Sequence, residues 1–201
     1  MEKLISFLID TIDKQYHQKK IFYFLNRLDV KIIFDIGAHK GEFLNFAKRL
    51  NKFKKIFSFE PQIKIFRMNK HLNKINKISY INLAISDKTG FKKLKINKKT
   101  STSTFSDINL KSKWYKLKSL LIDGNIKSSF INVENVKTVT LDNFFSKKKI
   151  KNIDLLKIDT EGHEKEVLIG AKNLMKNKKI KYILIEFHTS KMYKNYRPNN
   201  I

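Results

Sequence analysis

Five short apolar segments alternate with helical patterns along the chain, and this alternation constrains the fold more than any other feature. The segments are VKIIFDIG (30–37), KIFSFEP (55–61), ISYINLAIS (78–86), IDLLKIDT (153–160) and IKYILIEFH (180–188). Helical stripes lie between them at 43–50, 65–72 and 167–175. The segments are rich in Ile, Leu and Phe on both faces, as parallel strands covered by helices on each side are. The sequence therefore predicts an α/β fold with a doubly wound, mostly parallel sheet.

The rhythm changes in the middle of the chain. FKKLKI (91–96), after a turn at Lys88–Gly90, predicts the second arm of a hairpin with the preceding strand. Residues 97–136 carry polar and basic aromatic stretches without a regular pattern, which is typical of a lid or binding loop inserted into the domain. VKTVTLDNFF (136–145) then predicts a strand followed by a short helix.

Composition bounds the class of protein. At 201 residues the chain is long enough for one domain with a sizeable core, so we treat residues 1–201 as a single domain. It has no cysteine, which excludes a disulfide framework, a thiolate metal site and a cysteine nucleophile. The net charge of +25 would attract polyanions. However, only four of the 43 basic residues are arginine, whose guanidinium group binds phosphates and base edges better than the lysine ammonium does. Because the lysines are spread over the whole chain, the charge indicates solvated faces rather than a nucleic-acid-binding stripe.

The N-terminus begins with an amphipathic pattern, MEKLISFLIDTIDK, which predicts a helical segment within residues 1–27 that packs on the domain. Asp10 and Asp13 break the apolar stretch sooner than a secretory signal permits. No apolar run approaches the roughly 18–20 residues needed to span a bilayer. We therefore expect a cytoplasmic protein without a transmembrane segment.

Polar side chains follow the predicted strands at the points where they end. In an open parallel sheet, ligands bind beyond the carboxyl ends of the strands, where the strand order reverses. This rule selects as candidates Asp35, Glu60, Ser86, Asp87, Asp159, Glu186 and His188. Any single acid is equally well explained as a helix N-cap, so the argument rests on how many of them share one sheet edge.

The stretch FDIGAHKGEF (34–43) places an acid at a strand end, followed by two glycines. The dinucleotide pattern G-x-G-x-x-G binds a pyrophosphate without a facing carboxylate, so Asp35 argues against that ligand. A ligand with an ammonium, a carboxylate and a ribose fits better, because the acid faces the cation and the helix N-terminus faces the carboxylate. S-adenosylmethionine is such a ligand. Gly37 would let the backbone approach it, Gly41 would let the helix start close to the strand, and His39 would line the cofactor pocket.

Residues at the ends of three further strands complete the predicted cofactor site. Glu60 ends the second strand, and its carboxylate can accept from both ribose hydroxyls. Asp87, with Ser86 assisting, follows the third strand and is placed to hold the adenine edge. Asp159 ends the fourth strand and borders both the cofactor and the methyl group.

Six blocks together resemble the FkbM family of S-adenosylmethionine-dependent methyltransferases: FDIGAHKGEF, FSFEP, NLAISDKTG, VTLDNFF, LLKIDTEGHEKEVLIGAKNLM and ILIEFH. They follow the family's order from about residue 30 to residue 188, and K-I-D-x-E-G-x-E is the most specific of them. The resemblance implies a Rossmann-like methyltransferase fold and O-methylation of a hydroxyl. The substrate class that it implies is a sugar, a glycan or a related small metabolite.

Methyl transfer to a hydroxyl needs a group that takes the proton as the oxygen attacks. The candidates at this edge are Asp159, Glu161, His163, Glu186 and His188, of which we rank Asp159 first and Glu161 second. His163 is equally well explained as a first-turn residue of the helix that it begins. Without His163, the same set has enough oxygen ligands to gather a divalent cation that orients a diol, but its spacing does not demand a metal.

Two other functions stay open at this point. RNA methylation is favoured by the charge, but the chain lacks an N/D-P-P-Y-type motif. A catalytically silent binding module would keep the fold without the chemistry. The family resemblance also implies an antiparallel hairpin after the fifth strand, and HTSKMYKNYRPNNI (188–201) has room for at most one short element. We therefore expect a sheet that lacks this hairpin or that a partner completes.

Overall fold

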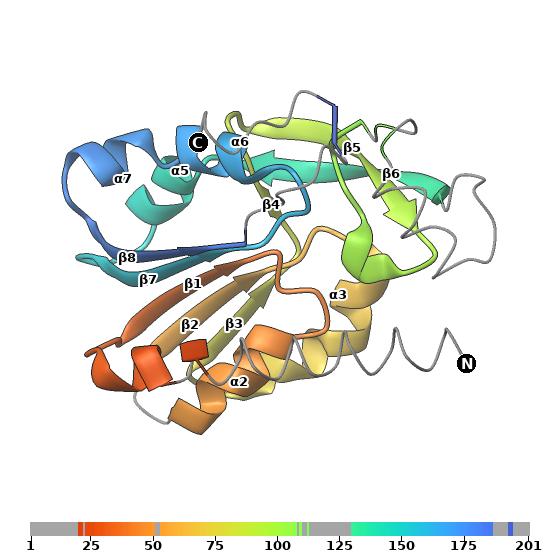
Figure 1. The fold of residues 1–201 in the computed structure, drawn as a ribbon. Coiled ribbons are helices and arrows are strands. Elements are labelled where there is room, and N and C mark those ends of the chain that lie inside the picture. Colours follow the sequence, from red (N-terminus) through yellow and green to blue (C-terminus); the bar gives the residue numbers. More distant parts are fainter. Residues whose placement is uncertain are drawn as a thin grey trace.

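The fold is built on a five-stranded parallel sheet. The computed structural model describes residues 20–21, 23–50, 53–107, 109, 112, 130–186 and 193–194. The strand order is β3-β2-β1-β7-β8, and every neighbouring pair is parallel (Figure 1). The strands are β1 (Ile32–Ile36), β2 (Lys55–Phe59), β3 (Ile78–Ile81), β7 (Ile153–Ile158) and β8 (Ile180–Ile185). The predicted doubly wound α/β sheet is confirmed, and its strand order reverses between β1 and β7.

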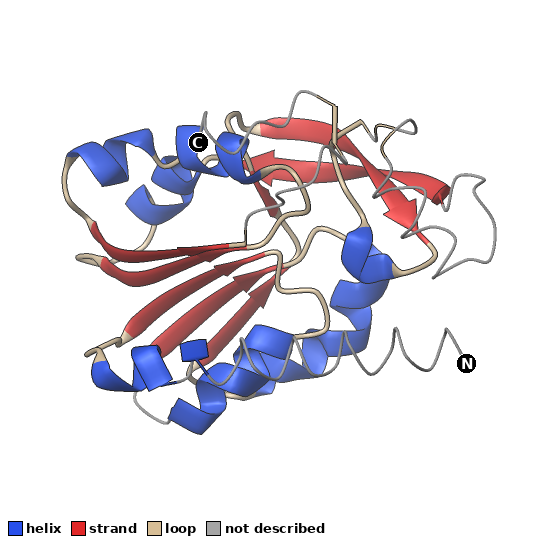
Figure 2. Ribbon diagram, viewed as in Figure 1, coloured by secondary structure: helices blue, strands red, loops and turns tan. Residues whose placement is uncertain are grey.

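Helices cover both faces of this sheet (Figure 2). On one face lie α2 (Glu42–Leu50), α3 (Ile63–Asn69) and the short 3-10 helix η1 (Lys70–Lys74). On the other lie α5 (Leu141–Ser146), α6 (Glu164–Ile169) and α7 (Lys172–Lys176). Each face has its own apolar cluster, one around Leu44, Ala47 and Leu72, the other around Phe144, Val167 and Leu174. Burial on both faces explains why the strands read as nearly continuous apolar runs.

Local sequence signals fix the helix starts on the second face. Thr140 caps α5, since its side-chain oxygen accepts a hydrogen bond of 3.1 Å from the backbone N–H of Asn143. Asp142 accepts hydrogen bonds from the backbone N–H groups of Asn173 and Leu174, which ties α5 to α7. The stripe at 167–175 forms two helices rather than one. The break falls at Gly170, where a Cβ would lie 2.1 Å from the carbonyl oxygen of Ser86.

A second, three-stranded sheet corrects two predictions. It consists of β4 (Ala84–Ile85), β5 (Gly90–Asn97) and β6 (Phe130–Val139), in the order β4-β6-β5. The single strand predicted over 78–86 is wrong, because the chain leaves the main sheet after β3. The side-chain amide of Asn82 donates to the carbonyl oxygens of Glu60 and Pro61 at this departure.

The predicted hairpin at Lys88–Gly90 is also wrong. The ten-residue β6 lies between β4 and β5, pairing parallel with β4 and antiparallel with β5. An eight-residue strand gains far more backbone hydrogen bonds from β6 than a two-residue strand could offer. This second sheet stands beyond the carboxyl ends of the main-sheet strands (Figure 1).

Several predictions fall wholly or partly outside the described residues. They concern residues 1–19 of the N-terminal segment, most of 108–129 in the insertion, and the hairpin expected after β8. The insertion itself is shorter than predicted, because β5 extends to Asn97 and β6 begins at Phe130. Among the described helices, none has the length and apolar character needed to cross a membrane.

Candidate functional site

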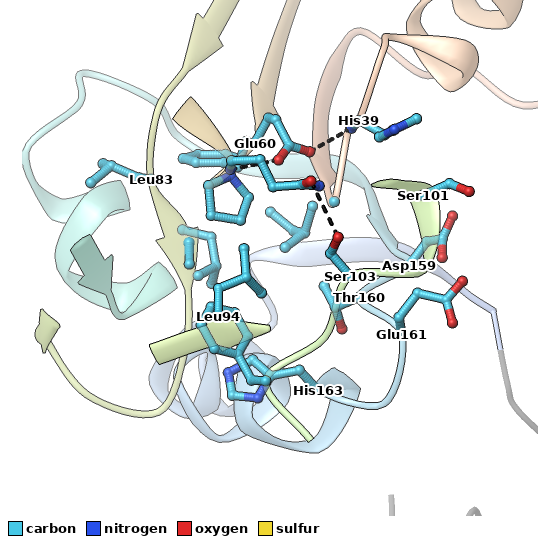
Figure 3. A pocket seen from close by; sticks show the side chains of 18 of the residues that line it. His39, Glu60, Leu83, Leu94, Ser101, Ser103, Asp159, Thr160, Glu161 and His163 are labelled. Carbon is cyan, nitrogen blue, oxygen red and sulfur yellow. Dashed lines mark hydrogen bonds between the residues drawn. The ribbon is translucent and has the colours of Figure 1, made fainter. Parts of the chain in front are cut away.

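A pocket lies beyond the carboxyl ends of β1, β2 and β7, where the strand order reverses (Figure 3). About 530 Å³ of space lies among its lining residues, and this figure includes space that is open to solvent. The predicted site residues in its lining are Gly37, His39, Glu60, Asp159, Glu161 and His163. Asp35, Gly41, Ser86, Asp87 and Glu186 lie outside the lining. The lining also includes residues of β4 and β5, of the segment that follows β5, and of the ends of the main-sheet strands.

Gly37 forms a tight turn at the end of β1. Its φ is +82°, a conformation that favours glycine, and a Cβ on it would lie 1.8 Å from the carbonyl oxygen of Asp159. The backbone N–H groups of Gly37 and Ala38 both donate to the carbonyl oxygen of Phe59. Gly37 thus leaves space for the end of the neighbouring strand β7, whereas the prediction from the sequence was that it leaves space for a ligand.

Glu60 is the most tightly fixed acid of the pocket. Its Oε2 accepts a hydrogen bond of 2.9 Å from the backbone N–H of His39, and its Oε1 accepts one of 2.7 Å from that of Gln62. Burial raises the pKa of Glu60 to about 7, against the opposing effect of these two amides. Each carboxylate oxygen can accept more than one hydrogen bond, so both remain able to bind a ligand hydroxyl. Figure 3 shows this carboxylate directed at the backbone of His39.

His39 connects the turn after β1 to the opposite wall. It has a positive φ of 44°, its Nδ1 lies 2.8 Å from Glu42 Oε1, and its Nε2 lies 2.8 Å from Thr100 Oγ1. The Tyr80 hydroxyl donates to the carbonyl oxygen of His39. Gly41 has a φ of +84° and begins the approach to α2.

Residues 100–106, here called the crossing segment, line part of the pocket and contact the loops that follow β2 and β7. At one end, the carbonyl oxygen of Thr100 accepts from the Gln62 side chain at 3.1 Å, and Ser103 Oγ donates to Gln62 Oε1 at 3.2 Å. At the other end, the Thr104 and Ser106 hydroxyls donate to the carbonyl oxygens of the loop after β7, each at 2.6 Å. The predicted lid begins with this segment, and its role as a lid stays a prediction.

A buried lysine of β7, Lys157, lies opposite Asp35 of β1 in the parallel pairing of these strands. Lys157 Nζ lies 3.0 Å from Asp159 Oδ2, 3.4 Å from Asp35 Oδ1 and 3.5 Å from the carbonyl oxygen of Gly37. Burial alone would lower the pKa of Lys157, but the charges of Asp159 and Asp35 raise it, so the side chain is an ammonium. Asp35 is fully buried, and burial raises its pKa. The cation that Asp35 faces in the structure is therefore Lys157.

The loop after β7 carries the second acidic cluster. Glu161 has a φ of +52°, and its carboxylate accepts a hydrogen bond from the buried Tyr193 hydroxyl. Glu186 lies at the end of β8, and its backbone N–H donates to the carbonyl oxygen of Ile158 at 3.0 Å. Partial burial and the charges of Asp159 and Glu161 raise the pKa of Glu186 to about 7. The structure thus brings three of the five predicted proton acceptors together. Of the other two, His163 belongs to a neighbouring group and His188 lies outside the described residues.

Ser86, Asp87 and His163 form a connected group next to the pocket. Ser86 Oγ lies 2.9 Å from His163 Nε2 and donates to Asp87 Oδ1 at 2.8 Å. Lys92 Nζ forms an ion pair of 2.7 Å with the same Asp87 oxygen. Burial opposes ionisation, but the hydrogen bonds from Lys92 and Ser86 lower the pKa of Asp87 to about 2. Burial lowers the pKa of His163 to about 3, so this imidazole is neutral. The assignment of Ser86 and Asp87 to the adenine edge stays a prediction.

The sequence reading missed three residues that shape the site. Lys157 was detectable, because a lysine within the apolar run LLKI must find a partner if that strand is buried. Gln62, which bridges Glu60 and the crossing segment, and Tyr193, which packs on Gly162, carry no comparable signal. Within the described part of the chain, no three His, Asp or Glu residues are arranged to hold a metal ion.

The chain is thus a doubly wound α/β protein with a pocket at the switch point of its main sheet. The family described as Methyltransferase FkbM domain matches residues 35–198. The chain therefore belongs to the FkbM methyltransferase family.

Comparison with known proteins gives two further similarities. The chain is 23% identical over 175 residues to the 2-O-methyltransferase NoeI of Sinorhizobium fredii, an alignment that covers 83% of this chain and 67% of that protein. It is also similar to the crystal structure of methyltransferase FkbM from Methylobacillus flagellatus KT, with 16% identity and a TM-score of 0.43. That alignment covers 75% of this chain and 31% of the solved chain, so this chain spans about a third of its length.

Proposed function

We propose that the chain is an S-adenosylmethionine-dependent O-methyltransferase that acts on a hydroxyl of a sugar, a glycan or a related small metabolite. The observation that carries this proposal is Glu60, a buried acid held by two backbone amides in a pocket at the switch point of the sheet. Family membership supports methyl transfer, and the name of the relative NoeI, a 2-O-methyltransferase, supports oxygen as the acceptor atom.

The residues of the pocket fit the proposed cofactor. Carboxylates of Glu60, Asp159 and Glu161 give it an acidic character that suits a cationic ligand with free hydroxyls. Leu83, Ile85, Leu94 and the apolar part of the β2 end supply surface for a flat, weakly polar ring. In this arrangement Glu60 would bind the two ribose hydroxyls, one at each carboxylate oxygen.

The cofactor supplies a methyl group on a positively charged sulfur, which is already a good leaving group. The protein must therefore hold the acceptor hydroxyl in line and remove its proton. Asp159 and Glu161 line the pocket, and so do Ser101 and Ser103 of the crossing segment (Figure 3). Hydroxyls and carboxylates around one opening suit an acceptor that carries several hydroxyl groups.

Calorimetric titration tests the cofactor assignment. We expect S-adenosylmethionine to bind the wild-type chain, and Glu60→Gln to weaken binding about tenfold or more, because one or two hydrogen bonds to a charged acceptor are lost. Asp29→Asn, which also turns a carboxylate into an amide but at an exposed residue before β1 and outside the pocket lining, should leave the affinity unaltered. Equal affinities of the wild type and Glu60→Gln would refute the ribose assignment. If the folded wild-type protein gives no heat of binding, the proposal that it is an S-adenosylmethionine-dependent enzyme is wrong.

The acceptor class requires a separate assay. Wild-type protein and S-adenosylmethionine are incubated with a panel of sugars, oligosaccharides and small hydroxylated metabolites, and S-adenosylhomocysteine is quantified. We expect turnover with at least one polyhydroxylated acceptor and a methyl ether as the product. Methylation of a nitrogen or of RNA in place of these acceptors would contradict the O-methyl assignment.

A further inference from the structure

The two ends of the main sheet differ in charge. Because all five strands are parallel, every loop that leads into a strand lies at one end of the sheet, and every loop that leaves a strand lies at the other. The leading loops are at the left of Figure 1, away from the pocket and from the second sheet. Together they are here called the entry edge, which consists of residues 28–31, 53–54, 75–77, 147–152 and 177–179.

The entry edge is rich in lysine and almost free of acids. The loops before β1, β2 and β3 carry Lys31, Lys54 and Lys77. The loop before β7 carries four lysines within 147–151, and the loop before β8 carries two at 178–179. Apart from Lys31, which is partly buried, all these lysines are exposed. The one acid among these residues is Asp29, which lies 3.0 Å from the Lys31 ammonium.

The loops that leave the strands have the opposite composition. Residues 37–41, 60–62, 82–83, 159–163 and 186 contain a single lysine, Lys40, and the acids Glu60, Asp159, Glu161 and Glu186. Lysines are thus present all over the chain, as the sequence indicated, whereas the acids of these loops gather at the pocket end. This unequal placement of the acids gives the entry edge a positive potential.

The lysines of the entry edge form a continuous row, because backbone hydrogen bonds join their loops. The carbonyl oxygens of Lys31 and Lys77 accept from the backbone of β2, and that of Lys179 accepts from the first residue of β7. Asp154 of β7 accepts from the backbone N–H of Lys31 at 2.9 Å, which joins the loop before β1 to β7. Neighbouring parallel strands lie about 4.8 Å apart, so the row is roughly 20 Å long and its neighbouring charges repel within a Debye length.

Exposed apolar side chains accompany this row. Ile75, in the loop before β3, is 42% exposed, and Met175, in the last turn of α7 before β8, is 37% exposed. Tyr23 and Phe24, in the helical residues that lead into the loop before β1, are 61% and 59% exposed. Apolar side chains beside lysines are suited to a bilayer surface, because the former enter the interface and the latter attract anionic headgroups.

A nucleic acid fits the entry edge less well. The described residues of the entry edge include no arginine, the residue that binds phosphates and base edges in a bidentate manner. Ile75 and Met175 would gain little from phosphate contacts, whereas a bilayer interface would cover them.

We propose that the entry edge is a docking surface for an anionic lipid bilayer, with its lysines at the headgroups and Ile75, Met175 and Phe24 in the interface. This inference does not depend on the proposed function. The pocket lies at the far end of strands of about five residues, on the order of 15 Å from the docked surface. Docking in this orientation therefore leaves the pocket accessible from the aqueous side.

Co-sedimentation with lipid vesicles tests this surface. The full chain is mixed with vesicles of phosphatidylcholine alone, or of phosphatidylcholine and phosphatidylglycerol, and the bound fraction is measured at increasing salt. We expect binding to the anionic vesicles only, and binding that weakens as salt is added. Lys54→Glu/Lys77→Glu/Lys151→Glu should bind about a hundredfold more weakly or worse, since each lysine near an anionic surface contributes about a factor of five. If the wild type does not bind anionic vesicles at low salt, the proposal is wrong.

A matched triple variant separates the position of the charges from their number. Lys64→Glu/Lys93→Glu/Lys165→Glu makes the same change in net charge at exposed lysines of α3, β5 and α6, outside the entry edge. It should retain vesicle affinity to within about tenfold of the wild type, because distant charges are screened. Circular dichroism checks folding, and glutamine at the same three positions of the entry edge replaces glutamate if that variant does not fold. Equal losses in the two triple variants would overturn the proposal, because binding would then depend on net charge alone.

The apolar residues separate a bilayer from other polyanions. Ile75→Ser/Met175→Ser keeps every charge, so we expect it to weaken vesicle binding several-fold and to leave any binding of polyuridylate RNA unaltered. Vesicle affinity that does not respond to this change would contradict insertion into the interface. If RNA is bound through the lysines of the entry edge while anionic vesicles are not, the surface is one for nucleic acid and the bilayer assignment is wrong.

Discussion

Replacing Gly37 by alanine should destabilise the fold far more than the same change at Gly41. Both glycines have nearly the same backbone conformation, with φ of +82° and +84°. An alanine in this left-handed region costs about 1–2 kcal/mol at either position. The surroundings differ: a Cβ at Gly41 would meet its nearest neighbours at 3.6 Å, whereas one at Gly37 would lie 1.8 Å from the carbonyl oxygen of Asp159.

The Gly37 clash cannot be relieved by a side-chain movement. The carbonyl of Asp159 belongs to a backbone whose N–H donates to Ile36 at 3.0 Å, so it would have to retreat by more than 1 Å and pull β7 away from β1. Overpacking of this kind adds about 1–3 kcal/mol. We therefore expect losses in the free energy of unfolding of about 1–2 kcal/mol for Gly41→Ala and about 2–5 kcal/mol for Gly37→Ala.

Urea denaturation of the cofactor-free protein, followed by far-UV circular dichroism, measures both values, and unchanged m-values would confirm that the native states are comparable. The glycine pair provides its own control, because only the clash separates the two variants. Losses that agree to within about 0.5 kcal/mol would refute the argument that Gly37 is required by the neighbouring strand.

Two further perturbations test the electrostatics and the packing of the site. Burial raises the pKa of Glu60 to about 7, so the native state binds a proton more tightly than the unfolded chain, and this group makes stability fall as pH rises from about 4.5 to about 7. In urea titrations across that window, the stability of Glu60→Gln relative to the wild type should therefore increase with pH by up to about 3 kcal/mol, and a constant difference would contradict the assignment. Tyr193→Phe should lower the unfolding free energy by about 1–2 kcal/mol through the lost hydrogen bond to Glu161. Tyr193→Ala should cost more, since the ring that packs on Gly162 is lost too; equal losses in the two variants would contradict this role of the ring.

The main sheet was predictable because its strands are buried on both faces. Each apolar run therefore appears in the sequence without reference to its partner, and the strand-end rule then locates Glu60 and Asp159 at one edge. The second sheet was not predictable in this way. Its outer face is exposed at Phe91, Ile131 and Val133, and its central strand pairs across more than 30 residues of chain. Periodicity identifies a strand but does not say which strand lies beside it.

The contacts of the acids were also beyond the sequence. Asp35 was predicted to face the ammonium of a ligand, whereas in the structure it faces the ammonium of Lys157 on the neighbouring strand β7. The partner of each carboxylate depends on contacts such as that of Tyr193 with Glu161, between residues far apart in the chain. Such contacts leave no spacing in the sequence to detect.

The two walls of the pocket have separate origins in the chain, and this has a consequence for how such a site can diversify. The acids and the glycine turn belong to ends of strands that are held by the whole main sheet, whereas Ser101, Ser103 and Phe105 belong to the crossing segment outside it. Substitutions at the tips of the crossing segment can reshape one side of the opening while every main-sheet strand keeps its register. Thr104 and Ser106 would still anchor that segment to backbone carbonyls, which any side-chain change in the loop after β7 leaves in place. The preference of the pocket for one ligand over another can therefore change in evolution while the residues at the main-sheet strand ends stay constant.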